Sequence, residues 1–231
     1  MRQVSVILPV HEEAGSIEAV VREIYDELRH QVGVQFIVCE DGSRDGTKDV
    51  LRELSQEIPM ALEASDERKG YSQAVLDGLH LVDTPYFLCL DSDGQCDPKD
   101  FWRLWSLIDA TDVVIGRRVP RQDAWQRRVL SKAFYLVFKS LFPIKLHDPS
   151  CPFVIGHQRV IRSLPDKPVL DQGFWWEFVA RTLGEGHRIE EVPIRHRARA
   201  VGKTKVYTWR TIPRIARTHV AGLWRIKREL G

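Results

Sequence analysis

Short apolar runs alternate with helix-patterned segments along the first half of this 231-residue chain. The predicted strands cover about 4–8, 35–39, 60–63 and 87–90, and the predicted helices between them cover 16–28, 46–54 and 71–82. In the first helix the apolar positions recur at the spacing of one buried helix face, and Ser16 is a candidate N-cap. Strands that alternate with helices form parallel βαβ units. The pattern therefore predicts an α/β protein with a mostly parallel sheet.

The regular alternation weakens in the second half of the chain. The predicted elements there are a helix near 98–109, a strand at 112–116, a helix at 125–141, a short strand and a helix after 153, a helix that begins at 174 and a strand near 188–193. A length of 231 residues with 43% hydrophobic content suits one large domain. We expect this domain to cover 1–206, followed by a basic amphipathic segment at 207–231.

Acidic loops follow three of the predicted strands, at 11–13, 40–41 and 91–93. In parallel sheets ligands bind beyond the carboxyl ends of the strands, so these loops are expected to meet at one edge. Asp91 and Asp93 come directly after a buried strand, where the backbone turns and both carboxylates can converge on one hard cation. The alternative is an ordinary turn, since Asp, Ser and Gly are common turn formers.

Charge and cysteine content restrict the class of protein. A formal net charge of +2 argues against a chain that binds nucleic acid through its overall charge. The segment 209–229 is nevertheless strongly basic, with Arg210, Arg214, Arg217, Arg225, Lys227 and Arg228 against the single acid Glu229. The four cysteines show no CxxC spacing and fit reduced thiols in the cytosol. No signal peptide and no apolar stretch of about 18 residues is present, so the chain is expected to be neither secreted nor membrane-spanning.

Six motifs occur in order along the chain, at 6–13, 40–47, 68–70, 91–95, 116–118 and 196–205. Their sequences are VILPVHEE, EDGSRDGT, RKG, DSDGQ, GRR and HRARAVGKTK. Each motif alone is weak, and the Gly-Arg-Arg motif is the weakest. Together they resemble the motifs of family 2 glycosyltransferases with the GT-A fold, and within that family the dolichyl- or polyprenyl-phosphate sugar synthases. The resemblance covers nearly the whole chain.

The resemblance implies a nucleotide-sugar donor bound at the acidic edge. The predicted donor-binding residues are Pro9, His11, Glu13, Asp41, Lys69 and Ser92. Asp41 is placed to accept a hydrogen bond from the base or the ribose, and its alternative role is an Asx-turn ahead of Gly42. The motifs do not specify the sugar or the base.

The resemblance also implies a metal at the Asp-Ser-Asp loop, held by Asp91, Asp93 and Gln95. Oxygen ligands of this kind favour Mg²⁺ or Mn²⁺. Such an ion stabilises, as a Lewis acid, the negative charge that develops on a departing nucleoside diphosphate.

A basic loop at 196–205 has the opposite charge to the metal loop. We expect it to close over the donor diphosphate, with Arg199 and Lys205 as the contacts and Gly202 as a hinge. The alternative is a solvated basic loop.

The acceptor implied by the resemblance is a polyprenyl phosphate, which is already anionic and needs cations rather than a base. Arg118, Arg127 and Ser131 match the acceptor-phosphate pattern of the family. The alternative is a hydroxyl acceptor on a glycan or lipid-linked saccharide, with Asp148 as the candidate base, although Asp-Pro more often marks a turn.

The segments 125–141 and 207–230 mix Trp, Phe and Leu with Arg and Lys, as helices in a bilayer interface do. Alternatively, both helices pack on the core and extend their basic side chains to solvent. The resulting hypothesis is a metal-dependent, inverting hexosyltransferase that is peripheral at the cytoplasmic, inner face of the membrane. A nucleic-acid-binding protein that uses the basic tail is a second class of function, and the oligomeric state is not specified.

Overall fold

The computed structural model describes residues 1–120, 125–197 and 212–231, without the side chains of 125–127 and 212–215. Its strands are β1 (Gln3–Val10), β2 (Gly33–Asp41), β3 (Met60–Ser65), β4 (Tyr86–Cys89), β5 (Val113–Arg118), β6 (Val154–His157) and β7 (Ile189–Ile194). Its α-helices are α1 (Ile17–Leu28), α2 (Thr47–Leu54), α3 (Tyr71–His80), α4 (Phe101–Trp105), α5 (Trp125–Leu141), α6 (Phe174–Gly184) and α7 (Ile212–Glu229). Three 3₁₀ helices also lie in the described part: η1 (Pro98–Asp100), η2 (Ile108–Ala110) and η3 (Gln158–Ser163).

Within the described residues the strands form one seven-stranded sheet in the order β3-β2-β1-β4-β6-β5-β7. The strand β6 runs antiparallel to β4 and β5, and the other neighbouring pairs are parallel. This arrangement confirms the predicted α/β class and the mostly parallel sheet.

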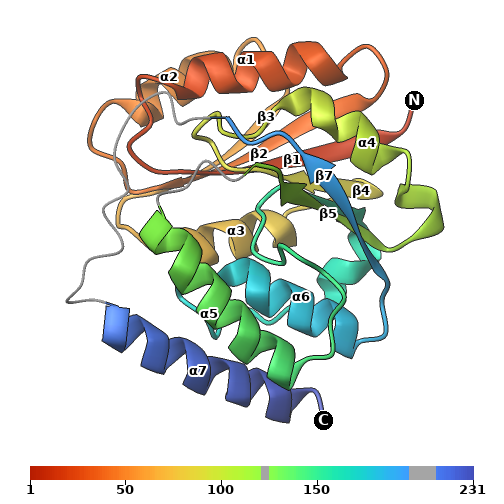
Figure 1. Ribbon diagram of the computed structural model, residues 1–231. Helices are drawn as coiled ribbons and strands as arrows, with labels where there is room; N and C mark the ends of the chain where they lie inside the picture. Colours follow the sequence, from red (N-terminus) through yellow and green to blue (C-terminus); the bar gives the residue numbers. More distant parts are fainter. Residues whose placement is uncertain (121–124, 198–211) are drawn as a thin grey trace.

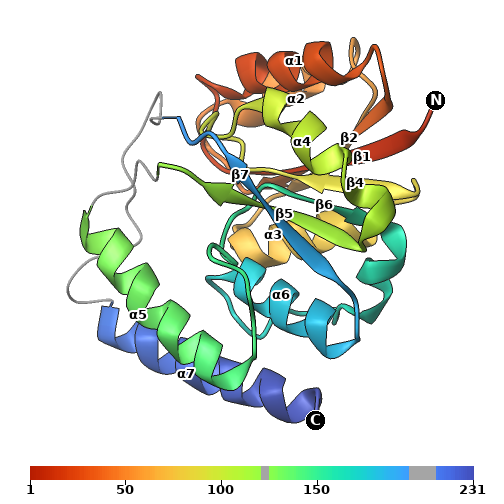
Figure 2. The same cartoon turned by 45° about the vertical axis from the view of Figure 1, so that its right-hand side comes forward.

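Helices cover both faces of the sheet (Figure 1). The helices α1, α2 and α4 lie on one face, and α3 and α6 lie on the other. The approach of α3 is close because residue 78 is glycine: a Cβ there would lie 2.6 Å from a side-chain carbon of Ile7. The helices α5 and α7 lie side by side beyond α6, away from the sheet (Figure 2).

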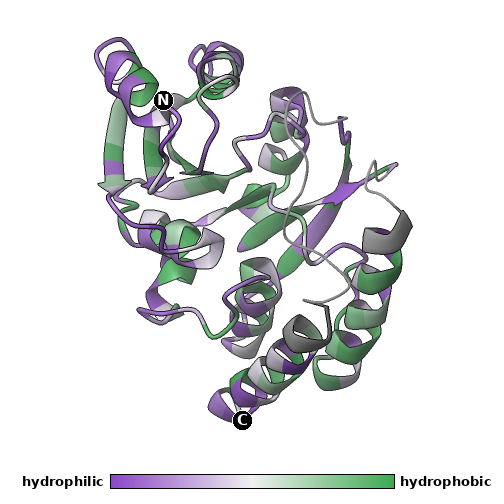
Figure 3. Ribbon diagram, turned by 90° about the vertical axis from the view of Figure 1, so that its left-hand side faces the viewer, coloured by the Kyte–Doolittle hydropathy of each residue, from purple (hydrophilic) through white to green (hydrophobic). Residues whose placement is uncertain are grey.

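The apolar side chains converge between these layers. The buried face of α1 consists of Ile17, Val20, Val21, Ile24 and Leu28, the positions whose spacing predicted the helix. Across the other face of the sheet, Phe87 and Phe178 meet edge to face with ring centroids 6.2 Å apart. Figure 3 shows the hydrophobic colour along the central strands and along α5. Because helices pack on both faces of the sheet, both sides of each central strand are buried, and the sequence of such a strand is a continuous apolar run.

Several predicted elements differ in detail. The helix expected near 98–109 is three short pieces, η1, α4 and η2, and the helix expected after β6 is the 3₁₀ helix η3. Ser16 lies at the N-cap of α1, but its hydroxyl donates to Glu13 and makes no capping bond to the helix. The expected boundary between 206 and 207 lies outside the described residues and stays a prediction.

All four cysteines are free and buried. Burial raises the pKa of Cys39 and of Cys151 to about 12, so both thiols stay protonated near neutral pH. Among the described residues, no helix is both long enough and apolar enough to cross a bilayer.

Candidate active site

The three acidic loops meet at one edge of the sheet, as expected from the sequence. Their strands β2, β1 and β4 are parallel neighbours, so the carboxyl ends lie together. Ser92 Oγ donates to the Pro9 carbonyl at 2.9 Å, and His11 Nδ1 lies 2.8 Å from the Asp41 carbonyl oxygen, to which it donates. These contacts join the end of β1 and the loop after it to the other two acidic segments.

The carboxylate of Asp41 is buried at the end of β2 and holds the start of α3. It accepts from the backbone N–H of Lys69 and, at 3.0 Å, from that of Gly70. Gly70 has φ 96°, a left-handed conformation that glycine adopts without strain. The predicted Asx-turn is absent from this described loop, because Ser43 N–H donates to Glu40 instead. Asp41 thus fixes the 68–70 motif against the sheet, and the Lys69 ammonium pairs with Asp77.

Asp91 is held by a hydrogen-bonded pair of aromatic side chains. The Tyr71 hydroxyl donates to Asp91 Oδ1 at 2.7 Å, and Trp175 Nε1 donates to the Tyr71 oxygen at 2.8 Å. Burial of the hydroxyl end and the charge of Asp91 raise the pKa of Tyr71 well above its usual value, so the phenol keeps its proton. The sequence analysis missed both residues. The available signals were that Tyr71 follows the 68–70 motif and that Trp175 belongs to an aromatic block.

Asp93 is nearly buried and shapes its own loop, because its Oδ1 accepts from Gln95 N–H at 3.1 Å. The turn and the paired acids proposed from the sequence are therefore the same structure. Gln95 also bonds to the backbone of Arg197: Arg197 N–H donates to the Gln95 carbonyl at 2.8 Å, and Gln95 Nε2 donates back at 3.2 Å. The metal loop is thus tied to the residue that directly precedes the segment 198–211.

The oxygen atoms of the loop 91–95 decide whether a metal ion fits this site. Asp91 and Asp93 supply carboxylate oxygens, and Gln95 supplies an amide oxygen. Among the described residues, no three His, Cys, Asp or Glu side chains form a cluster that could hold an ion alone. Mg²⁺ is commonly bound by one or two carboxylates together with waters and substrate phosphates. The site fits an ion shared with a diphosphate.

Arg118 and Asp148 form a buried bidentate pair beside this edge. Arg118 Nε and one terminal nitrogen each lie 2.8 Å from Asp148, and the same terminal nitrogen donates to Ser150 Oγ at 2.9 Å. Arg118 is 8% exposed and Asp148 is 4% exposed. The backbone N–H of Asp148 donates to Glu191 of β7 at 2.7 Å. The pair therefore locks the loop before β6 onto the end of β5.

The buried thiol of Cys96 directly follows the metal loop, at the edge of the sheet where the acidic loops meet. The pKa of Cys96 is raised well above its usual value, first by burial and then by Cys151, Asp91 and Asp93, whereas Arg118 lowers it. The strands β4 and β5 run in the same direction on either side of β6, so Asp91 and Asp93, which follow β4, and Arg118, which ends β5, lie at the same edge of the sheet. The predicted metal-loop acids and the predicted acceptor arginine are thus brought together.

Some predicted site residues lie outside the description. The side chain of Arg127 and all of Arg199 and Lys205 fall there. Ser131 is half-buried on α5, one helical turn after Arg127.

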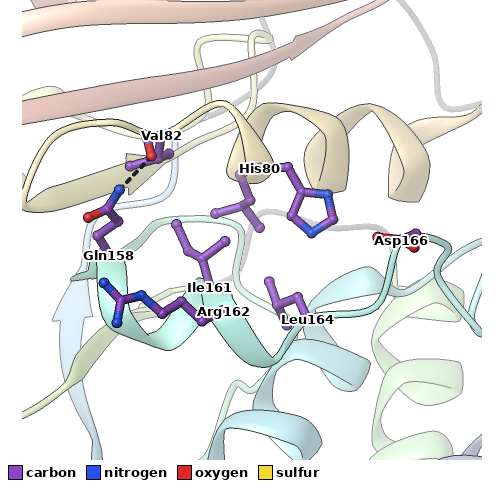
Figure 4. A pocket seen from close by; sticks show the side chains of 8 residues that line it. His80, Val82, Gln158, Ile161, Arg162, Leu164 and Asp166 are labelled. Carbon is purple, nitrogen blue, oxygen red and sulfur yellow. Dashed lines mark hydrogen bonds between the residues drawn. The ribbon is translucent and has the colours of Figure 1, made fainter.

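A separate pocket of about 310 Å³ lies between the end of α3 and η3 (Figure 4). Its lining includes His80, Arg162 and Asp166, and Gln158 Nε2 donates to the Val82 carbonyl at 2.7 Å. Val82 precedes β4, whereas Asp91 follows it. The pocket is therefore at the opposite end of that strand from the acidic loops and is not part of the site.

Solved structures of similar fold are glycosyltransferases of the GT-A class. Glucosyl-3-phosphoglycerate synthase from Mycobacterium tuberculosis, in complex with Mn²⁺, UDP-glucose and phosphoglyceric acid, superposes with a TM-score of 0.74 at 18% identity over 98% of this chain and 80% of that one. Mannosyl-3-phosphoglycerate synthase from Rubrobacter xylanophilus gives 0.72 at 17% identity over 99% and 74%. At these identities the likeness shows the fold.

The sequence places the chain within that class. Residues 5–170 match the profile of glycosyl transferase family 2, and the chain belongs to this family. It is 26% identical to a dolichol-phosphate mannosyltransferase of Pyrococcus furiosus over 88% of this chain and 59% of the relative. It is 27% identical to a polyprenol monophosphomannose synthase of Mycolicibacterium smegmatis over 87% of this chain and 80% of the relative. The chain is a glycosyltransferase, and the predicted resemblance to polyprenyl-phosphate sugar synthases is confirmed.

Proposed function

We propose that this glycosyltransferase transfers a hexose, with inversion, from a nucleoside diphosphate sugar to a polyprenyl phosphate in a reaction that requires Mg²⁺ or Mn²⁺. The observation that carries the proposal is the convergence of opposite charges at one sheet edge. Asp91 and Asp93 lie beyond β4, and Arg118 is the last residue of β5, which ends at the same edge of the sheet. Relatives named for polyprenyl and dolichol phosphates support the acceptor class.

The donor would bind across the loops that follow β1, β2 and β4. Pro9 lies near the end of β1, and His11 and Glu13 lie on the loop that follows it, beside Asp41 and Ser92. Asp91, Asp93 and the Gln95 amide oxygen would hold the ion, which when bound supplies Lewis-acid stabilisation of the departing diphosphate. Arg199 and Lys205, which lie outside the described residues, would contact the diphosphate.

The acceptor phosphate would bind near Arg118, Arg127 and Ser131. An anionic phosphate attacks without losing a proton, so the reaction needs cations rather than a base. A hydroxyl acceptor would need a base, and its candidate, Asp148, has both carboxylate oxygens bonded to the Arg118 guanidinium. This pairing argues against Asp148 as the base that a hydroxyl acceptor would need. Family membership favours the enzyme over the nucleic-acid-binding alternative.

The exposed surfaces of α5 and α7 support action at a membrane. Val129 and Leu136 are seven residues apart on α5, hence on one side of that helix, and both are exposed together with Trp224 of α7. The exposed basic residues of the two helices include Arg128, Lys132, Lys139, Arg217 and Arg225. Such a combination suits the interface of an anionic leaflet, where each basic side chain contributes about 1 kcal/mol. We propose that the enzyme acts at the cytoplasmic face of the membrane.

The proposal is tested by incubating the protein with labelled GDP-mannose or UDP-glucose, Mn²⁺ and either a polyprenyl phosphate or the corresponding polyprenol. The expected result is a labelled lipid product from the phosphate and none from the alcohol. Product formed from the alcohol, or no lipid product with any donor, contradicts the proposal.

A further inference from the structure

We infer that Tyr71 and Trp175 are positioning residues that fix the Asp91 carboxylate in the orientation needed to bind a divalent ion with a nucleoside diphosphate. The inference rests on the proposed metal role of Asp91. It assigns a function to two aromatic side chains that lie outside the acidic loops.

The contacts run in one direction, from α6 to the metal loop. Trp175 Nε1 can only donate, and it donates to the Tyr71 oxygen at 2.8 Å. The Tyr71 hydroxyl has a single proton, and it directs that proton to Asp91 Oδ1 at 2.7 Å. The tryptophan thus orients the phenol, and the phenol orients the carboxylate. A carboxylate offers about four acceptor positions, so this hydrogen bond is compatible with metal binding.

Both aromatic residues are themselves held firmly. Trp175 is 4% exposed, and its ring packs edge to face on Phe174 and Phe178, with centroids 5.2 and 5.5 Å away. Tyr71 is the first residue of α3, directly after Gly70, whose N–H is bound by Asp41. The hydroxyl that reaches Asp91 is therefore fixed from two independent elements.

Orientation of a ligand carboxylate by a hydrogen-bonded neighbour has a measurable effect. An aspartate at a strand end samples several rotamers, and a metal selects only those that direct an oxygen toward it. Loss of the groups that orient metal ligands typically lowers metal affinity about 10- to 100-fold. The Asp93 carboxylate is oriented differently, by the backbone N–H of Gln95. The hydrogen bond to Asp91 comes from the side chain of Tyr71, so a substitution can remove it.

The experiment measures Mn²⁺ affinity by electron paramagnetic resonance in the presence of GDP or UDP, with the full chain and without turnover. Tyr71→Phe removes the hydroxyl and keeps the ring, and we expect it to weaken Mn²⁺ binding about tenfold or more. Trp175→Phe should weaken it in the same direction. The double variant should bind no more weakly than Tyr71→Phe, because the tryptophan acts through the hydroxyl that is already gone.

Matched controls lose the same kinds of hydrogen bond elsewhere. Tyr135→Phe removes a hydroxyl that donates to the Leu146 carbonyl at 2.8 Å, and Trp102→Phe removes an indole N–H that donates to Glu27 at 2.7 Å. Both should leave Mn²⁺ affinity unchanged. A thermal midpoint without ligand is recorded for every variant, and if Tyr71→Phe is unfolded at the assay temperature, Trp175→Phe provides the same comparison.

Asp93→Ala separates failure of this inference from failure of the proposed function. If Asp93→Ala loses Mn²⁺ binding while Tyr71→Phe binds as the wild type or more tightly, the positioning role is wrong and the metal site stands. Independent, additive losses in the double variant overturn the relay from Trp175 through Tyr71. If Asp93→Ala binds Mn²⁺ as the wild type does, the metal site itself is wrong, and the positioning role falls with it.

Discussion

The buried Arg118–Asp148 pair distinguishes two accounts of the acceptor, and Asp148→Asn tests it. The substitution keeps the size of the side chain but removes its charge. In the wild type, two guanidinium nitrogens each lie 2.8 Å from one oxygen of Asp148. Asparagine has only one side-chain oxygen, so one of these nitrogens would face an amide N–H₂ instead. Arg118, 8% exposed, would lose the charge of the carboxylate that it contacts with two nitrogens.

The expected cost follows from burial and distance. Two unit charges about 4 Å apart at an effective dielectric constant of about 20 attract by about 4 kcal/mol. Removal of one partner of a buried ion pair costs about 3–5 kcal/mol. For a chain of this size, that loss lowers the thermal midpoint by about 6–20 °C. The exposed pair Arg2–Asp109, with side chains 47% and 63% exposed, is a matched control. Asp109→Asn should leave the stability nearly unchanged, because solvent screens an exposed pair.

The assay is urea unfolding of both variants, together with transfer to polyprenyl phosphate at a temperature where each is folded. A loss of stability below about 1 kcal/mol for Asp148→Asn would refute the argument from burial. A hydroxyl-acceptor enzyme with Asp148 as base predicts in addition that turnover disappears even at a temperature where Asp148→Asn is folded.

Three further predictions concern α7, the membrane surface and the cysteines. The hydrogen bond from Arg181 lowers the pKa of Glu229 below its usual value of 4.5. The contribution of Glu229 to the docking of α7 is therefore present above about pH 4.5 and is lost as the pH falls through the pKa of Glu229 in the folded protein. Hydrogen exchange of α7 between pH 3 and 6 should show that loss in the wild type but not in Glu229→Gln, and equal pH profiles would contradict it. Trp224→Ala should weaken binding to vesicles that contain anionic lipid about tenfold, as measured by flotation. The control Leu81→Ala, which removes an exposed apolar side chain elsewhere, should leave this binding unchanged. Cys39 is buried and has a pKa of about 12, so it should resist iodoacetamide at pH 8 until the protein unfolds. Mass spectrometry measures this labelling, and rapid labelling of the folded protein would contradict the burial of Cys39.

The sequence predicted the sheet and its acidic edge because those features are local. Apolar runs and helix spacing record which side of each segment is buried, and the acids of 91–93 follow their strand directly. The same local signals did not separate the segment 98–109 into short 3₁₀ and α pieces. Tertiary packing decides such turns, and the pattern of apolar residues is compatible with either arrangement.

The hydrogen bonds that support the site could not be predicted from local sequence patterns, because they join residues that are distant in the sequence. Tyr71 meets Asp91 across 20 positions, and Trp175 meets Tyr71 across 104. Arg118 and Asp148 were each identified as candidates for the acceptor site, but their pairing across 30 positions was not. Motif patterns identified Asp91, Arg118 and Asp148 individually, and only the fold shows which side chains neutralise or orient them.

The central claim is that the paired acids beyond β4 bind the metal needed for hexose transfer to a lipid phosphate. Its most direct test is a single-turnover measurement of labelled hexose transferred to polyprenyl phosphate by the wild type and by Asp93→Ala, each with Mn²⁺ and with excess EDTA. We predict transfer by the wild type with Mn²⁺, none with EDTA, and none by Asp93→Ala although it unfolds at a similar temperature. Transfer that persists in EDTA, or in a folded Asp93→Ala, would contradict the claim.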